Sequence, residues 1–308
     1  MVEHVPDKNG VEGSIPSTRI MSLEVKENES LKNHSTFRIG GPARYFCVAK
    51  SKEEILEAIN FAKEKSLPFF VFGGGSNILF RDEGFDGVAI KSQISNIKTQ
   101  NLIITASSGT PFAQVIMKSI EAELTGLEWG IGIPGTIGGC VAGNCGAYGH
   151  DISELVKNVK TLDKEYPKDK CGFSYRESRF KSPKAPNTAL GQGEIILEIE
   201  LELKKGDKDK SKNEIKSIIT NRKGKIPPYP SIGCIFKNPK PLTARSLIEQ
   251  CGLKWMKIGD AQISDVHPNF IVNIGNASSG DVLALIDICK KEVKNKFNID
   301  LQEEIVVI

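Results

Sequence analysis

Two glycine-dense stretches are the residues whose chemistry follows most directly from their type and spacing. Residues 130–149 contain 8 of the 29 glycines of this 308-residue chain, and Gly73-Gly74-Gly75-Ser76-Asn77 directly follows the apolar run PFFVF at 68–72. Glycine tolerates positive φ and lets a backbone approach a ligand closely, so glycine runs that follow strands form concave sets of N–H groups suited to phosphate. We therefore expect two loops that hold one dinucleotide pyrophosphate from two sides.

The second loop also contains a spacing that suggests a different nucleotide fold. Gly130-Ile-Gly132-Ile-Pro-Gly135 fits G-x-G-x-x-G, and Glu154 follows 19 residues after Gly135. The Rossmann motif, however, needs a strand before the glycines and a helix that opens on them. LEWG at 127–130 is a poor strand, and the glycines at 143, 146 and 149 argue against a helix directly afterwards. The Rossmann interpretation is therefore disfavoured, and tight turns without a ligand stay open as an alternative.

The elements that must position these loops are expected to mix helices and strands. Ser51-Lys52-Glu53-Glu54 fits a capping box, and Thr110-Pro111 fits the N-cap and first residue of a helix that reaches about Leu124. Apolar patterning predicts the other elements. These are a strand from about Met21, strands at 68–72, 88–91, 102–107, 156–163, 194–203, 270–273 and 301–308, and helices at 242–251 and 280–297. A lysine-rich segment at 204–216 has the composition of a domain boundary or an exposed helix start.

Charge and hydropathy exclude two classes of protein. Lys and Arg number 41 against 38 Asp and Glu, and the resulting net charge of +3 is too weak for a general nucleic-acid binder. No stretch approaches the roughly 20 consecutive apolar residues that a membrane-spanning helix needs. We expect a globular protein with no nucleic-acid or membrane partner.

The cysteines and the N-terminus indicate the compartment. The seven cysteines are odd in number and scattered, which favours free thiols in the cytoplasm over a disulfide framework. Cys140 and Cys145 lie in a glycine loop without a second pair, so no metal site is expected. Residues 1–20 lack the apolar core of a secretory signal. They are expected to be a disordered tail or a non-native extension before a start at Met21.

Six motifs, taken together and in order, resemble the UDP-N-acetylenolpyruvoylglucosamine reductase family. They are NHSTFRIGGPARYF (33–46), VFGGGSNILFRDEGFDGVAI (71–90), GIPGTIGGCVAGNCGAYG (132–149), FSYRESRFK (173–181), PSIGCIFKNP (230–239) and LQEEI (301–305). The resemblance covers about Ser30 to Ile308. Its combination of motifs is specific, whereas GGGSN alone would not be.

The resemblance implies an α+β fold with a two-part FAD-binding region of the vanillyl-alcohol-oxidase (PCMH) type at 21–210, split near 90–100. A C-terminal α/β substrate-binding domain would follow at 211–308. Only 58 positions separate Arg176 from Cys234, which indicates the shorter of the family's two structural types. FAD would be bound without a covalent link. The expected FAD contacts are Gly73, Gly74, Gly75, Ser76, Asn77, Pro134, Gly135, Thr136, Gly139, Asn144 and Gly146.

The implied reaction is reduction of UDP-N-acetylglucosamine enolpyruvate to UDP-N-acetylmuramate for peptidoglycan synthesis. NADPH would reduce the flavin, and the flavin would pass hydride to the vinyl carbon of the substrate. Charge then builds on the substrate carboxylate, and the neighbouring carbon needs a proton. This chemistry needs a cation and hydrogen-bond donors at the carboxylate, together with one positioned acid. A monomer in the cytoplasm is expected.

Three residues match the family's catalytic positions. Arg176 in SYRESRF would supply the cation, and Glu304 in LQEEI would be the catalytic glutamate. Alternation places Glu303 and Glu304 on opposite faces of a strand, and only the motif favours Glu304. Cys234 departs from the family, which commonly has serine there as the proton donor. A thiol is a stronger acid than a hydroxyl, so the role is chemically compatible.

Four further residues are expected to bind the substrate: Tyr175, Arg222, Lys225 and Asn238. Lys237 lies in the same motif as Asn238, and cations there suit a diphosphate. His267 is a weaker candidate, with a structural role as its alternative.

Two other functions stay open at this point. The chain could be another FAD oxidase or dehydrogenase of the same fold, although no histidine between His34 and His150 is available for a covalent flavin link in the two loops. It could also be a non-catalytic nucleotide-binding module, which would not need Arg176, Cys234 and Glu304.

Overall fold

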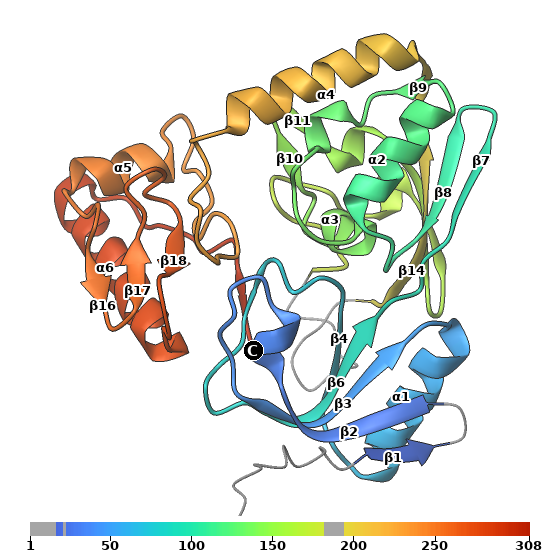
Figure 1. Cartoon of the computed structure of the whole chain (residues 1–308), viewed down its shortest axis with the longest axis horizontal. Helices are drawn as coiled ribbons and strands as arrows, with labels where there is room; N and C mark the ends of the chain where they lie inside the picture. The colour runs from blue at the N-terminus through green and yellow to red at the C-terminus, as the bar shows by residue number, and fades with distance from the viewer. Residues whose placement is uncertain (1–16, 21–22, 182–193) are drawn as a thin grey trace, which may run out of the picture.

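The computed structural model describes residues 17–20, 23–181 and 194–308, arranged as three packed units (Figure 1). The first unit is a five-stranded sheet in the order β1 (Ser17–Ile20), β2 (Leu23–Ser30), β3 (Pro42–Ala49), β6 (Phe85–Ser92) and β4 (Phe69–Phe72). The β3–β6 and β4–β6 pairs are parallel, and the β1–β2 and β2–β3 pairs are antiparallel. The first glycine loop begins where β4 ends.

Two apolar clusters cover this sheet. The helix α1 (Lys52–Glu64) buries Ile55, Ala58, Ile59 and Ala62 against Val25, Val88 and Ile90. A second cluster contains five phenylalanines: Phe46, Phe70, Phe72, Phe80 and Phe85. Ser51 caps α1 by accepting a hydrogen bond from the backbone N–H of Glu54, but the predicted capping box is incomplete, because the Glu54 carboxylate accepts from the Lys50 N–H and not from the Ser51 N–H. Residues 17–20 of the expected disordered tail or non-native extension form β1, so the disordered alternative does not hold for them; residues 1–16 lie outside the described residues.

The second unit is an antiparallel sheet in the order β13 (Glu165–Pro167), β12 (Val156–Thr161), β14 (Ile196–Glu202), β8 (Ile103–Ser107) and β7 (Ile97–Gln100). The helices α2 (Phe112–Glu121), α3 (Ile137–Ala142) and α4 (Lys208–Arg222) belong to this unit, and β9 (Leu124–Thr125) pairs with β15 (Lys204–Lys205). Short 3-10 turns lie at Glu128–Gly130, Ile152–Glu154 and Lys168–Lys170, and β10 (Gly146–Ala147) pairs with β11 (His150–Asp151).

Two predictions about this unit need correction. A helix, α3, does form within the second glycine loop, directly after the G-x-G-x-x-G segment, because Thr136 caps it and its glycines allow close packing: a Cβ on Gly138 would lie 2.7 Å from Cβ of Ser108. Thr110 does not cap α2. Pro111 occupies that position, and the Thr110 hydroxyl donates to the Asn96 carbonyl instead. The G-x-G-x-x-G segment is preceded by a 3-10 turn and not by a strand.

The third unit combines the three-stranded sheet β16 (Lys257–Ile258), β17 (Ala261–Ile263) and β18 (Ile271–Asn273) with α5 (Ala244–Gln250) and α6 (Ser279–Phe297). The helix α4 lies along the second unit and leads toward the third (Figure 1). Ile215 of α4 belongs to the core of the second unit, and Ser211 bonds to the buried Glu128 there. The expected boundary at 210/211 falls inside this helix, and we propose a boundary after Arg222.

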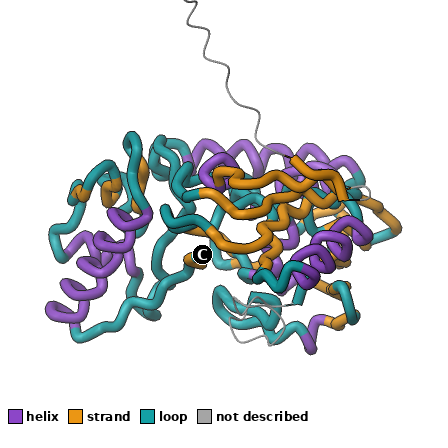
Figure 2. Tube along the Cα trace, turned by 90° about the horizontal axis from the view of Figure 1, so that it is seen from below, coloured by secondary structure: helices purple, strands orange, loops and turns teal. Residues whose placement is uncertain are grey.

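The chain end returns from the third unit to the first. The expected strand at 301–308 is reduced to β19 (Val306–Val307), which pairs in parallel with β5 (Ile78–Leu79) just after the first glycine loop. A single bridge joins Glu303 to Phe236. The C-terminus consequently lies between the units in both views (Figures 1 and 2). The segment 301–307 therefore brings the third unit into contact with the first glycine loop. No helix among the described residues is long and apolar enough to cross a membrane.

Candidate active site

The two glycine loops face each other at very short range. A Cβ on Gly74 would lie 2.9 Å from Cα of Gly135, and a Cβ on Gly73 would lie 2.4 Å from the hydroxyl oxygen of Thr136. The Ser76 hydroxyl donates to the Pro134 carbonyl at 3.1 Å and ties the loops together. No other residue type fits Gly73 or Gly74 without displacing the opposite loop. The sequence prediction that both loops act on one ligand is supported by this contact.

The loops carry free backbone donors that suit a pyrophosphate. No described residue accepts a hydrogen bond from the backbone N–H groups of Gly74, Gly75 and Ser76, or from those of Gly135 and Thr136. Gly75 and Gly135 have φ of +62° and +112°, a region that glycine adopts readily. Free N–H groups on apposed glycine loops are the donor set of an anion-binding nest. The residues present therefore fit the diphosphate of FAD.

Thr136 and Asn144, like Ser76 and Asn77, are expected cofactor contacts whose side chains are engaged by protein. The Thr136 oxygen accepts a hydrogen bond from the Gly139 N–H and caps α3. Asn144 is buried, donates from its amide to the Ser174 carbonyl at 2.8 Å and accepts from the Ser153 N–H at 3.2 Å. The side chain of Asn144 therefore joins the glycine loop to the SYRESRF motif.

Arg176 lies at the end of the second glycine loop. Its Nη2 donates to the Gly146 carbonyl at 2.6 Å and its Nη1 to the Asn144 carbonyl at 3.3 Å, while its Nε lies 3.1 Å from Oε1 of Glu304. A guanidinium has five N–H donors, so these contacts leave two for a ligand. Arg176 itself has φ of +58°, a left-handed conformation that is uncommon outside glycine.

Glu304 is held by residues from all three units. Its backbone N–H donates to the Ile235 carbonyl at 2.7 Å, and its carbonyl accepts from Asn77 at 3.1 Å and from Lys181 Nζ at 2.8 Å. Burial raises the pKa of the Glu304 carboxyl, although the positive charges of Arg176 and Lys181 oppose that shift. A carboxyl in this setting holds a proton more readily than an exposed one does.

The two neighbouring acids have different partners. The Glu303 carboxylate forms an ion pair with Lys290 of α6, whereas the Glu304 carboxylate meets Arg176. The alternation expected from the sequence is therefore present, and Glu304 is the acid that faces the glycine loops.

Cys234 joins this cluster. Burial and the neighbouring Glu304 charge raise the pKa of the Cys234 thiol to about 12, while Arg176 and a hydrogen bond from Asn269 act in the opposite direction. The thiol is therefore protonated at neutral pH. Arg176, Cys234 and Glu304, which lie far apart in the sequence, interact with one another in the folded chain.

Two family profiles and several known proteins match this chain. A profile of the UDP-N-acetylenolpyruvoylglucosamine reductase C-terminal domain matches residues 226–308, and a profile of an FAD binding domain matches residues 43–165. The chain is 37% identical over 292 residues to the UDP-N-acetylenolpyruvoylglucosamine reductase of Clostridium novyi, covering 92% of each chain. It is also 37% identical to the enzyme of that name from Clostridium tetani, covering 93% of each. This chain belongs to the UDP-N-acetylenolpyruvoylglucosamine reductase family.

A solved structure supports the same assignment. The UDP-N-acetylenolpyruvylglucosamine reductase of Thermus caldophilus matches with a TM-score of 0.76 at 31% sequence identity, over 92% of this chain and 99% of that one. The α+β fold with an FAD-binding region and a C-terminal domain, expected from the sequence, is confirmed.

Two of the substrate residues expected from the reductase family meet beside Arg176. The Tyr175 hydroxyl oxygen accepts a hydrogen bond from the Asn238 backbone N–H at 3.4 Å, and the Tyr175 ring lies 5.3 Å from the Arg176 guanidinium and 5.1 Å from Lys240 Nζ. The side-chain oxygen of Asn238 accepts from the Ala244 N–H at the start of α5, so it serves a structural contact. Lys237 forms an ion pair with Glu177.

The other expected substrate residues lie elsewhere. Arg222 ends α4 and donates to the Ile131 carbonyl at 3.0 Å, against the outer part of the second glycine loop. Lys225 is exposed in the connection that follows. Within the described part of the chain, neither residue contacts Arg176, Cys234 or Glu304. His267 is mostly buried, which lowers its pKa to about 4, and it packs edge-on to Phe270. A neutral, structural imidazole is the better interpretation there.

Sequence reasoning missed Asn269 and Lys181. The Asn269 oxygen accepts from the Phe236 N–H at 2.9 Å, its amide donates to the Phe236 carbonyl at 2.8 Å, and it also bonds to Cys234. Lys181 donates to the carbonyls of Arg176 and Glu304. Both residues stand inside or beside motifs that the sequence singled out, DVHPNF and FSYRESRFK. Type and spacing gave no signal that separated them from their neighbours.

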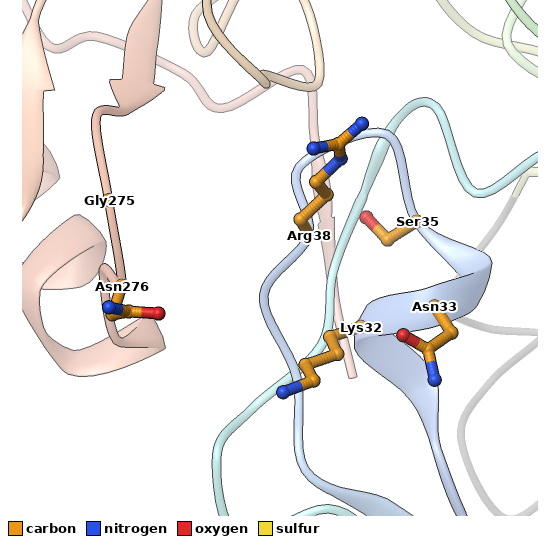
Figure 3. Close-up of a pocket in the computed structure, with 6 residues that line it drawn as sticks. All are labelled: Lys32, Asn33, Ser35, Arg38, Gly275 and Asn276. Carbon is orange, nitrogen blue, oxygen red and sulfur yellow. The ribbon is translucent and has the colours of Figure 1, made fainter.

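A separate pocket of about 390 Å³ lies at the junction of the first and third units. It is lined by Lys32, Asn33, Ser35, Arg38, Gly275 and Asn276, and Figure 3 shows the residues of the first unit on one side and Asn276 opposite them. None of these is among the residues expected to act on a substrate. No group of three or more potential metal ligands was found among the described residues.

Proposed function

We propose that this chain is an FAD-dependent reductase that converts UDP-N-acetylglucosamine enolpyruvate to UDP-N-acetylmuramate with NADPH as the reductant. FAD, when bound, accepts hydride from NADPH and supplies it to the vinyl carbon of the substrate. The observation that carries this proposal is the meeting of Arg176, Cys234 and Glu304 at the end of the second of two glycine loops that fit FAD. The loops of residues 73–76 and 134–136 would hold the diphosphate of the cofactor through backbone N–H groups.

Arg176 would bind the substrate carboxylate. Three of its five N–H groups are fixed by the Asn144 and Gly146 carbonyls and by Glu304, so the guanidinium is held before a ligand arrives. The two remaining N–H groups match the two oxygens of a carboxylate. Because the guanidinium is fixed and always charged, it stabilises charge that builds on that carboxylate during the reaction.

The surrounding charges favour an anionic substrate. Three positive charges, on Arg176, Lys181 and Lys237, lie close enough to influence the Glu304 carboxyl. Among the charges that act on it, Glu177 supplies the negative one. Protonation of Glu304, which its raised pKa favours, would leave the positive charge of Arg176 free for the substrate carboxylate. A protonated Glu304 could also donate a hydrogen bond to the charge that develops there.

Cys234 would donate the proton that completes the reaction. Its thiol is protonated at neutral pH, and it lies with Arg176 and Glu304, where the carbon next to the carboxylate would be placed. The thiolate left after proton transfer would be stabilised by the positive charge of Arg176 and the hydrogen bond from Asn269, the two contacts that lower the pKa of Cys234. Tyr175 would contact the substrate from the other side of Arg176. Arg222 and Lys225 stay as candidates for the diphosphate-sugar or NADPH through their position beyond the glycine loop.

The decisive experiment follows the flavin spectrum of the purified protein. NADPH should bleach the flavin absorbance under anaerobic conditions, and UDP-N-acetylglucosamine enolpyruvate should restore it with formation of UDP-N-acetylmuramate. The proposed reaction would be contradicted if the enolpyruvyl substrate failed to restore the flavin absorbance. It would also be contradicted if a small aldehyde or ketone, the oxidised form of an alcohol, restored that absorbance. We also propose a monomer in the cytoplasm. Size-exclusion chromatography with light scattering should then give a mass near 33.7 kDa.

A further inference from the structure

Two cysteines meet at the end of the helix α3, inside the second glycine loop. The Cys145 N–H donates to the Cys140 carbonyl at 2.8 Å, and the Asn144 N–H donates to the Val141 carbonyl at 3.1 Å. Asn144 has φ of +42°. These two hydrogen bonds, together with the left-handed conformation of Asn144, form the Schellman motif that ends many helices.

The Schellman motif brings together the two side chains that are thiols here. A contact between the residue three positions before the helix cap and the second residue after it frequently accompanies the motif, and in this chain these residues are Cys140 and Cys145. Both pack in the core of the second unit. A side-chain hydrogen bond joins the Cys145 and Cys140 thiols, and this contact and burial both raise the pKa of the Cys140 thiol. Both are free thiols in the structure.

The position of this pair connects it to Arg176. Cys145 lies between Asn144 and Gly146, whose carbonyls hold the two terminal nitrogens of the guanidinium at 3.3 and 2.6 Å. A disulfide S–S bond is about 2.05 Å long, which is shorter than any non-bonded contact between two sulfurs. Closing that bond would draw residue 145 toward α3 and shift both carbonyls that position Arg176.

We propose that Cys140 and Cys145 are a redox modification site, at which a peroxide converts the two thiols to a reversible disulfide. Cys145, which is partly exposed, attacks one oxygen of hydrogen peroxide as the thiolate and becomes a sulfenic acid, releasing hydroxide. The buried Cys140 loses its proton, attacks the Cys145 sulfur and displaces a second hydroxide. The two released thiol protons neutralise the two hydroxides. Two thiols and one peroxide thus give one disulfide and two waters, and a dithiol reductant reverses the change.

The chemical test does not depend on the proposed function. The FAD-loaded full-length protein is treated with increasing hydrogen peroxide, its free thiols are alkylated, and trypsin peptides are mapped without reduction. No Lys or Arg lies between residues 119 and 156, so both cysteines stay in one peptide. That peptide should lose both alkyl groups, be 2 Da lighter than its reduced form and regain both thiols after dithiothreitol. Two alkylated cysteines in that peptide at peroxide concentrations that oxidise the partly exposed Cys251 would overturn the proposal.

Variants separate the disulfide from other oxidation. Cys145→Ala and Cys140→Ala should each prevent the 2 Da loss, while the matched control Cys251→Ala should keep it; Cys251 is a partly exposed thiol beside Cys289 in the third unit. Disulfide formation that persists in Cys145→Ala would contradict the assignment.

The effect on Arg176 rests on the proposed function and is measured separately. In a Cys234→Ser background, oxidation should lower kcat/KM for the enolpyruvyl substrate at least about 10-fold. Complete removal of one donor that stabilises the developing charge lowers kcat by about 10²–10³-fold, and a displaced donor should lose part of that effect. Dithiothreitol should restore the rate, and the added Cys145→Ala change should make it insensitive to peroxide. A rate unchanged by a disulfide that the peptide map shows would refute the coupling to Arg176 and leave the site itself intact.

Discussion

Replacing the thiol of Cys234 is expected to separate the two halves of the proposed reaction. A positioned general acid contributes about 10²–10⁴-fold to a rate, which corresponds to about 3–6 kcal/mol at about 1.4 kcal/mol for each factor of ten. Cys234→Ala should therefore slow reoxidation of the flavin by the enolpyruvyl substrate by that factor. Flavin reduction by NADPH should stay within about twofold, because it needs no acid at this position. Cys234→Ser should keep substantial turnover, because a hydroxyl can donate the same proton.

The raised pKa of Cys234 also predicts how slowly its thiol is alkylated. Its pKa of about 12 means that about one thiol in 10⁴ is ionised at pH 8, whereas an ordinary thiol with a pKa of about 8.5 is roughly one-quarter ionised there. Alkylation proceeds through the thiolate. Iodoacetamide should therefore modify Cys234 at roughly 4 × 10⁻⁴ of the rate of an unperturbed thiol, and the rate should rise about tenfold per pH unit up to about pH 11.

Stopped-flow absorbance and peptide mass mapping supply the two measurements. Each half-reaction is followed in the wild type, in Cys234→Ala, in Cys234→Ser and in Cys251→Ala as a control thiol outside the site. Full turnover in Cys234→Ala would remove Cys234 from the mechanism. Alkylation of Cys234 at pH 8 as fast as that of a free thiol would show that burial and the Glu304 charge do not hold its pKa high, and the assignment as a protonated donor would then fail.

Three further predictions concern other parts of the molecule. Arg176→Lys should lower kcat for the enolpyruvyl substrate about 10²–10³-fold, because an ammonium lacks the planar set of donors that the glycine loop holds in place. Flavin reduction by NADPH should change little. Equal losses in the two half-reactions, measured by stopped flow, would argue against a role of Arg176 at the substrate. Asn269→Ala should lower the free energy of unfolding in urea by about 2–5 kcal/mol, because it leaves the N–H and carbonyl of Phe236 without partners in a buried site. Asn269→Asp should cost at least as much, because its carboxylate would be buried and would face the Phe236 carbonyl without a donor. A loss below about 1 kcal/mol in either variant would argue against this account. Burial raises the pKa of the Cys47 and Cys289 thiols to about 12, so the folded chain retains protons that the unfolded chain releases above about pH 8.5. These groups should leave the free energy of unfolding unchanged below that pH and lower it between about pH 9 and 12. Cys289→Ala should reduce the slope of that decline, measured by urea unfolding.

Local patterns were sufficient for most helices and strands. The capping residue Ser51 opens α1, and the apolar run at 68–72 contains the whole of β4, because these signals act within a few residues. The short helix α3 was missed, since its glycines lower helix propensity and only packing against Ser108 makes them favourable. The last strand was overestimated, because residues 306–307 pair with β5, more than 220 positions earlier in the chain.

The sequence by itself determined the two glycine loops, the set of motifs and the three residue types that the chemistry needs. It also showed that Glu303 and Glu304 must point in opposite directions, since that follows from backbone geometry alone. Which acid faces Arg176 was decided by the tertiary structure: Glu303 turns toward Lys290 on α6, and Glu304 lies between Asn77, Lys181 and Arg176. The reason is physical: these partners come from segments far apart in the chain, and the local pattern of residues 301–305 carries no information about which of them each acid will meet.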